Sequence, residues 1–192
     1  MKLLEKDKGV SWQKEFFSIP NCLCYFRLLL LPVFVWVFFH DTPGKPNWAA
    51  LFVIAVSGLS DCADGIIARR FDMITEWGKI IDPVADKLTQ LTVACCLTIR
   101  FPYMGILFAV MICKELVTGI TTLVKFRKGH RIDSAMWFGK VATAVFDVLM
   151  VLVLGFGELL PPAVNIACVL ITTALMLFAF VRYMIVLLKL GK

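Results

Sequence analysis

Residues 48–68 have the sequence WAALFVIAVSGLSDCADGIIA, an apolar run that ends in two carboxylates, Asp61 and Asp64. A run of this length and composition is long enough to cross the hydrocarbon core of a bilayer as a helix. Acidic side chains inside such a segment are costly and are usually kept for a function. The segment therefore predicts a membrane helix with a functional site near one end.

The rest of the chain has the same apolar character. Hydrophobic residues make up 60% of the 192 residues and charged residues only 18%, whereas soluble domains are nearer one half and one quarter. Apolar runs bounded by turn and charge signals predict five further helices, at Cys22–Phe39, Ile80–Ile99, Pro102–Phe126, Trp137–Phe156 and Ala163–Leu188. We expect an all-α polytopic membrane protein with six transmembrane helices, in which residues 20–192 form one transmembrane domain.

Residues 1–19 are expected to form a separate N-terminal cytoplasmic segment. Aromatic residues such as Trp12 and Phe16 alternate with polar ones at helical spacing, which favours a helix lying in the membrane interface. A disordered tail is the alternative. The segment has no apolar core and no cleavage site, so it does not resemble a cleaved signal peptide.

Positive residues predict the orientation. They are concentrated in the N-terminal segment, in the loops 69–79 and 125–140 and at the C-terminus, whereas the opposite loops carry only Lys45 and Arg100. The positive-inside rule then places both termini in the cytoplasm, which requires an even number of spans. The net charge of +6 indicates contact with anionic lipid, and no nucleic-acid-binding pattern is present.

The seven cysteines lie mostly in apolar runs without a paired C-x-x-C spacing. This pattern predicts reduced thiols that pack as small hydrophobic residues, rather than disulfides or a zinc site.

Four carboxylates are predicted to converge at the cytoplasmic side. Asp61 and Asp64 share one face of the second predicted span, while Asp82 and Asp86 follow Gly78 at four-residue intervals on the third. Four acids in one partly desolvated place need cations among them. Oxygen ligands alone, with no histidine or cysteine expected nearby, favour hard divalent ions, Mg²⁺ or Mn²⁺. Two such ions roughly 4 Å apart would suit phosphoryl transfer.

Small residues share the faces that carry these acids, namely Gly65, Ala68 and Gly78. They could let two membrane helices approach closely, or they could leave room for a bulky polar substrate against the backbone. Beside the acids the second use is favoured, and Arg69 could then neutralise a phosphate group.

The motif resembles that of a known family, the CDP-alcohol phosphotransferases. The pattern D-x2-D-G-x2-A-R-x8-G-x3-D-x3-D is matched at every fixed position, by Asp61, Asp64, Gly65, Ala68, Arg69, Gly78, Asp82 and Asp86. The resemblance implies six transmembrane helices, often after an interfacial helix. It also implies that an alcohol attacks the β-phosphorus of a CDP-linked donor and that CMP leaves.

The resemblance further assigns roles by position. Two divalent ions, Mg²⁺ or Mn²⁺, would be held by Asp61, Asp64, Asp82 and Asp86. Asp86 would also be the catalytic base that takes the proton of the acceptor hydroxyl. The CDP part of the donor would be contacted by Asp61, Gly65, Ala68, Arg69 and Gly78.

Within this family the chain looks most like the bacterial phosphatidylglycerophosphate synthases. Ile19–Arg27 resembles their I-P-N-x-L-T-x-x-R opening with Cys24 in place of Thr, and Asp82–Lys87 is close to D-P-L-A-D-K. The implied reaction joins CDP-diacylglycerol to sn-glycerol 3-phosphate at the cytoplasmic face of the bacterial inner membrane. A cardiolipin synthase that uses phosphatidylglycerol is the alternative, because Ala142 replaces a Lys of the later G-K-x-K-T pattern.

An anionic acceptor would need cationic side chains. The candidates for its phosphate are Lys114, Arg127, Arg131 and Lys140, although positive-inside bias or an ion pair could also explain them. Arg27 either faces the site or snorkels to the interface. A small secondary transporter is the alternative from another class, but it favours internal repeats and polar helices at mid-membrane. The sequence is compatible with a homodimer.

Overall fold

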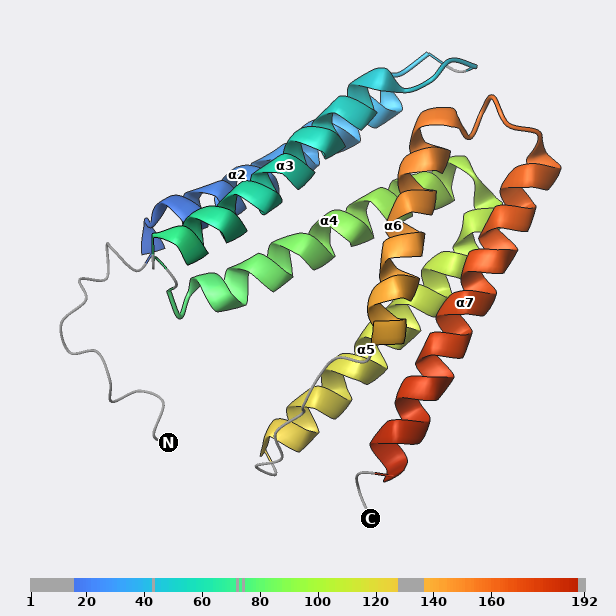
Figure 1. Ribbon diagram of the computed structural model, residues 1–192. Helices are drawn as coiled ribbons and strands as arrows, with labels where there is room; N and C mark the ends of the chain where they lie inside the picture. The colour runs from blue at the N-terminus through green and yellow to red at the C-terminus, as the bar shows by residue number, and fades with distance from the viewer. Residues whose placement is uncertain (1–15, 43, 72, 74, 128–136, 190–192) are drawn as a thin grey trace, which may run out of the picture. The chain divides into compact units, whose positions relative to one another are not determined.

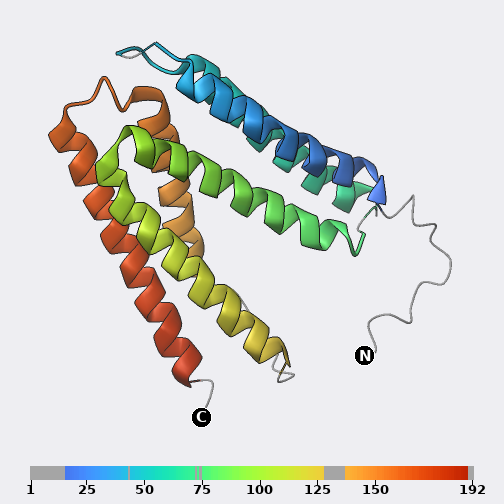
Figure 2. The same cartoon turned by 180° about the vertical axis from the view of Figure 1, so that it is seen from behind.

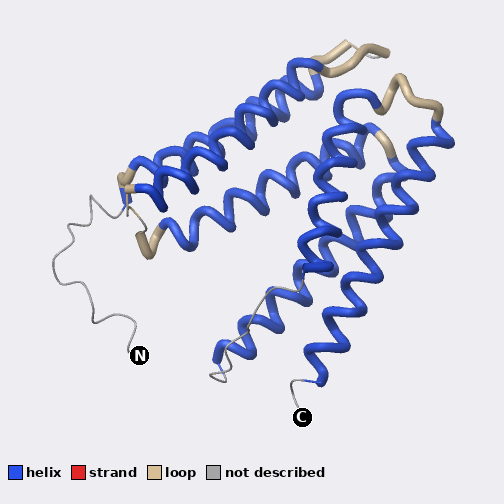
Figure 3. Tube along the Cα trace, viewed as in Figure 1, coloured by secondary structure: helices blue, strands red, loops and turns tan. Residues whose placement is uncertain are grey.

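The computed structural model describes residues 16–42, 44–71, 73, 75–127 and 137–189. Within these ranges the chain forms helices and connecting turns and no strand (Figure 3). The α-helices are α2 (Ile19–Phe39), α3 (Trp48–Arg70), α4 (Gly78–Arg100), α5 (Gly105–Arg127), α6 (Trp137–Phe156) and α7 (Pro162–Lys189), and a short 3-10 helix, η1 (Pro102–Met104), precedes α5. The prediction of an all-α chain is confirmed for the described residues.

Four helical segments in the described part of the chain are long and apolar enough to cross a membrane, at Ile19–Phe39, Trp48–Arg70, Pro102–Thr121 and Pro162–Ile185. The helices expected for the other two spans are present but differ in character. α4 begins with a charged stretch that includes Lys79, Asp82, Asp86 and Lys87. Among the described residues, the apolar part of α6 is Val141–Phe156. Length and composition therefore support four of the six expected spans.

The chain divides into two compact units. The first contains Met1–Asp41 and Trp48–Thr92, and in it α2 and α3 lie side by side in antiparallel directions (Figures 1 and 2). Phe34 and Phe38 of α2 are buried with stacked rings whose centroids are 5.9 Å apart. Large apolar side chains elsewhere on α2 and α3 are exposed, as a lipid environment would favour.

The second unit contains Thr42–Asn47 and Val93–Lys192. In it α7 packs against both α5 and α6. The buried side chains of this unit include Leu107, Phe146 and Met176. Its loops are joined by Glu158, which follows α6, accepts a hydrogen bond from the backbone N–H of Gly44 and pairs with Arg100 at the end of α4. Gly44 has φ 83°, a left-handed conformation that suits glycine.

This loop contact gives the second unit a stability that should depend on pH. The Gly44 N–H and then Arg100 hold the pKa of Glu158 below its usual value of 4.5, against the opposing effect of desolvation. A carboxyl whose pKa is lowered by folding stabilises the fold above its unfolded pKa, and this contribution is lost as pH falls through the folded value. We expect Glu158→Gln to lower the thermal unfolding temperature at neutral pH, with the difference from wild type shrinking as the pH falls through the lowered pKa of Glu158.

Thermal unfolding in detergent between neutral and acidic pH measures this effect. Glu76→Gln is the matched control, because Glu76 pairs with Lys79 at an exposed position, where an ion pair contributes little. Equal behaviour of the two variants across the pH range would contradict the assigned role of Glu158.

Candidate active site

The buried guanidinium of Arg27 lies at the centre of the carboxylate cluster in the first unit. Its Nη2 is 2.5 Å from Asp64 Oδ2, and its Nη1 is 2.6 Å from Asp61 Oδ1 and 3.5 Å from Asp82 Oδ1. Only 2% of the Arg27 side chain is exposed. Of the two orientations left open by the sequence, the structure therefore gives the one in which Arg27 faces the acids.

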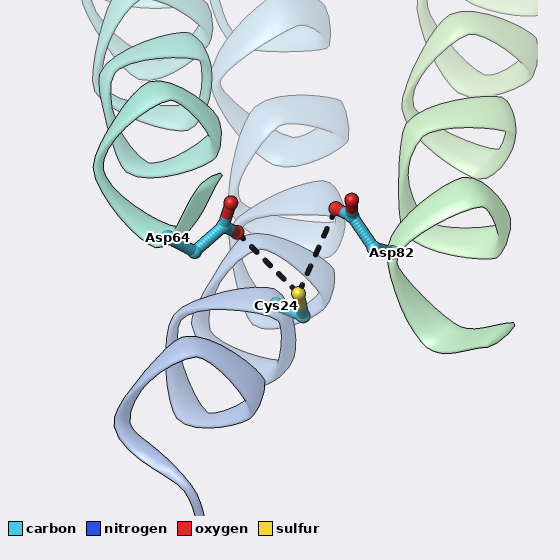
Figure 4. A group of neighbouring side chains, drawn as sticks. All are labelled: Cys24, Asp64 and Asp82. Carbon is cyan, nitrogen blue, oxygen red and sulfur yellow. Dashed lines mark hydrogen bonds between the residues drawn. The ribbon is translucent and has the colours of Figure 1, made fainter. Parts of the chain in front are cut away.

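Cys24 lies one turn before Arg27 on α2 and extends the cluster (Figure 4). Its Sγ is 3.4 Å from Asp64 Oδ2 and 3.8 Å from Asp82 Oδ1. One potential ligand atom from each of these three residues lies within 4.8 Å of the other two. Three helices, α2, α3 and α4, thus each contribute a donor atom to one point.

The carboxylates of the cluster differ in their exposure to solvent. Asp64 is 4% exposed at its side chain, whereas Asp61 and Asp82 are about half exposed, at 48% and 49%. Asp86 is exposed one helical turn after Asp82 on α4. The structure therefore brings Asp61, Asp64 and Asp82 together around Arg27, and a polar ligand can approach them from the exposed side.

A cavity of about 140 Å³ adjoins the carboxylates of Asp64 and Asp82. Cys24, Asp64 and Asp82 line it. So do the three small residues singled out from the sequence, Gly65, Ala68 and Gly78. The Arg69 side chain is exposed at the end of α3, and its Nε donates to the carbonyl oxygen of Gly65 at 2.9 Å. The small residues thus leave space beside the acids.

Hydrogen bonds hold the start of α4 against the start of α2. Thr75 Oγ1 accepts from the backbone N–H of Gly78 at 2.9 Å and from Asn21 Nδ2 at 3.1 Å. Trp77 Nε1 donates to the Tyr25 hydroxyl at 2.8 Å. Because Asp82 follows Gly78 by one turn, these contacts also fix where its carboxylate lies.

Gly78 is expected to be essential for this close approach. A Cβ at position 78 would lie 2.7 Å from Asn21 Oδ1 and 2.9 Å from Thr75 Oγ1. Asn21 is 1% exposed, so its amide cannot move aside without breaking its bond to Thr75. We expect Gly78→Ala to lower the free energy of unfolding by about 1 to 3 kcal/mol, as overpacking typically does.

Thermal unfolding in detergent tests this expectation, with Gly58→Ala on α3 as the matched control. A Cβ at Gly58 would meet nothing within 4 Å, and alanine favours a helix more than glycine does. Gly58→Ala should therefore not destabilise the protein. A Gly78→Ala protein as stable as wild type would contradict the steric argument.

The donor set fits a divalent cation. The carboxylate oxygens suit a hard ion, and a single guanidinium offsets only one of the three negative charges around it. Arg27 Nε is buried and makes no hydrogen bond to any described residue, and Nη1 meets its carboxylates at ion-pair distance without hydrogen-bond geometry. These N–H groups call for a hydrogen-bond acceptor, whereas the excess negative charge of the carboxylates is what calls for a cation.

The proposed acceptor residues belong to the second unit. Lys114 on α5 is largely buried, with its Nζ 3.1 Å from Glu115 Oε1 and 3.2 Å from Thr143 Oγ1 of α6. Arg127 ends α5 and Lys140 lies in the first turn of α6, but their side chains are outside the described residues, as is all of Arg131.

Comparisons with known proteins agree with the motif. The family model for CDP-alcohol phosphatidyltransferase matches residues 17–188. Curated relatives named CDP-diacylglycerol–glycerol-3-phosphate 3-phosphatidyltransferase include one from Shigella flexneri serotype 5b (strain 8401), 30% identical over 171 residues, and one from Escherichia coli (strain K12), 29% identical over 171 residues. Both alignments cover 88% of this chain and 93% of the relative.

Proposed function

Because the chain belongs to the CDP-alcohol phosphatidyltransferase family, we propose that it transfers the phosphatidyl group of CDP-diacylglycerol to sn-glycerol 3-phosphate. The products are CMP and phosphatidylglycerophosphate. The chain is a membrane transferase of phospholipid biosynthesis, and the names of its relatives support this donor and acceptor. The observation that carries the proposal is the convergence of Asp61, Asp64 and Asp82 around one buried point.

Four carboxylates would hold the cations of this reaction. Asp61, Asp64, Asp82 and Asp86 would bind two Mg²⁺ or Mn²⁺ ions, which suit an oxygen-rich donor set. Bound there, the ions would offset the negative charge that develops on the pyrophosphate as CMP departs.

The remaining steps belong to side chains of the protein. Asp86, exposed beside the cluster, would accept the proton of the acceptor hydroxyl as it attacks the β-phosphorus. Gly65, Ala68 and Gly78 would let the CDP group approach the backbone, since they line the cavity with little side-chain bulk. Arg69 would bind a donor phosphate through its guanidinium.

An acceptor panel tests the proposal. The purified protein, reconstituted with CDP-diacylglycerol and Mg²⁺, should release CMP with glycerol 3-phosphate and not with serine or inositol phosphate. A chelator should abolish the release, and added Mg²⁺ or Mn²⁺ should restore it. Full turnover in metal-free buffer would contradict the cation site.

A cardiolipin synthase is the second candidate. Ala142 is completely buried on α6, at the place where the motif resemblance has a second Lys, so one cationic donor for an acceptor phosphate is missing. Turnover with phosphatidylglycerol but not with glycerol 3-phosphate would favour this candidate.

Lys114 would hold the acceptor phosphate, together with Arg127, Arg131 and Lys140. A charge-assisted hydrogen bond to a buried phosphate contributes about 1.5 to 3 kcal/mol. Lys114→Ala should therefore raise the KM for glycerol 3-phosphate roughly 10- to 150-fold and leave the KM for CDP-diacylglycerol nearly unchanged. Steady-state kinetics measure both constants, with Lys45→Ala as the control for loss of a positive charge. An unchanged acceptor KM would remove Lys114 from this role.

The proposed topology has six spans, with α4 and α6 crossing the membrane beside the four more apolar segments. The charged start of α4 and both termini would face the cytoplasm under the positive-inside rule. In a bacterium the protein would lie in the inner membrane, with the active site on the cytoplasmic side.

A further inference from the structure

The thiol of Cys24 differs in its surroundings from that of Cys96, the other buried cysteine of the described chain. The side chain is 2% exposed, yet its sulfur faces two carboxylates rather than apolar groups. Cys96, by contrast, is buried beside Ala94 and Leu97 on α4, as the sequence predicts for a thiol that packs as a small hydrophobic residue. Simple packing therefore does not account for Cys24.

The separation of the donor atoms matches that of two ligands on one cation. A thiolate sulfur about 2.3 Å and a carboxylate oxygen about 2.1 Å from a tetrahedral zinc ion lie about 3.6 Å apart. Cys24 Sγ lies within hydrogen-bonding distance of Asp64 Oδ2, at 3.4 Å, and of Asp82 Oδ1, at 3.8 Å, and the same distances would suit a thiolate and two carboxylates on one cation.

Arg27 does not prevent such binding. Its Nη2 contacts Asp64 Oδ2 and its Nη1 lies 3.5 Å from Asp82 Oδ1, so both oxygens that face Cys24 also face the guanidinium. An ionised carboxylate oxygen has more than one lone pair, so Asp64 can accept from the guanidinium and still face a cation. The positive charge of Arg27 would weaken cation binding without occupying the sulfur.

We propose that Cys24 is a ligand of the cation held by Asp64 and Asp82, and that it shifts the preference of this site toward thiophilic divalent ions such as Zn²⁺ and Co²⁺. The inference rests on the cation site of the proposed function and adds a soft donor to it. Sulfur ligands select zinc and cobalt over Mg²⁺ and Mn²⁺, which prefer oxygen. Cys24 stands where the resembling motif has Thr, a hydroxyl donor of similar size.

Spectroscopic titration of the full chain with Co²⁺ tests the sulfur ligand directly. Wild type in lipid nanodiscs should develop a sulfur-to-cobalt charge-transfer absorption in thiol-free buffer. Cys24→Thr should lack this absorption, and Cys22→Thr should keep it, because Cys22 is exposed two residues earlier on the same helix. Cys24→Ser is a second variant without sulfur, in case Cys24→Thr fails to fold.

The affinities of wild type and of the sulfur-free variants for Co²⁺, Zn²⁺ and Mn²⁺ complete the test. Removing the sulfur should weaken Co²⁺ and Zn²⁺ binding by about tenfold or more, the loss typical when a group at a metal centre is removed. Mn²⁺ binding, followed by electron paramagnetic resonance, should change little. Unchanged Co²⁺ absorption and affinity in both sulfur-free variants, with Mn²⁺ still bound, would overturn the role of Cys24 alone. Failure of wild type to bind Mn²⁺ or Co²⁺ would overturn the cation site of the proposed function as well.

Discussion

Replacing Asp86 with Asn is expected to reduce kcat by about 100- to 10,000-fold, the usual contribution of a general base. The amide keeps the size of the carboxylate but cannot take the proton of the acceptor hydroxyl. Because Asp86 is exposed one turn beyond the buried cluster, its replacement should leave the fold and most of the donor site intact. CMP release measures turnover, and equilibrium binding of CDP-diacylglycerol in nanodiscs should stay within a few fold of wild type.

Asp82→Asn provides the contrast. Its carboxylate faces both Arg27 and Cys24, so its loss should reduce Mn²⁺ binding and turnover together. Asp86→Asn should separate the two, with turnover falling much further than cation affinity. Turnover close to wild type in Asp86→Asn would exclude Asp86 as the base.

The sequence was sufficient to predict the helices and the acidic core of the site. Residue spacing alone placed Asp61 and Asp64 on one helix face and Asp82 and Asp86 on one stripe of the next, and the structure brings Asp61, Asp64 and Asp82 around one point. Gly65, Ala68 and Gly78 line the cavity beside the acids, but Gly78 also packs closely against Asn21, so their contact with a substrate stays a prediction. These features depend on local periodicity, which a sequence displays directly.

The contribution of α2 was harder to predict. Asn21, Cys24 and Arg27 recur at three-residue intervals and are all buried, on the side of α2 that also carries Phe34 and Phe38. Polar residues on the otherwise buried stripe of a helix are the signal that could have identified them. The partner of each one could not be read from the sequence, because it depends on how α2 packs against α3 and on where α4 begins.

The number of membrane spans shows a related limit. Periodicity located α4 and α6 correctly as helices, but α4 is less apolar than the segments that meet the length and composition of a span. In α4 the charged residues occupy the first turns, where the site requires them. The functional residues thus reduce the hydrophobic signal of the helix that carries them.

Replacing Arg27 with Gln is expected to lower the free energy of unfolding of the cation-free protein by about 3 to 5 kcal/mol, as breaking a buried ion pair typically does. Asp64 would lose its guanidinium partner while remaining almost completely buried. Chemical unfolding in a chelator-containing buffer measures the loss. Arg70→Gln is the matched control, because Arg70 is exposed at the end of α3 and surface charges contribute little.

Added Mn²⁺ should stabilise Arg27→Gln more than it stabilises wild type. Without the positive charge of Arg27, the carboxylates should bind Mn²⁺ more tightly, and a ligand that binds only the folded state stabilises it in proportion to the logarithm of its affinity. The gain in stability on adding saturating Mn²⁺ should therefore be larger for Arg27→Gln than for wild type or Arg70→Gln. Equal gains in all three proteins would mean that Arg27 and the cation do not share the carboxylates. If Arg27→Gln lost the same large free energy of unfolding with and without chelator, Arg27 would have a purely structural role.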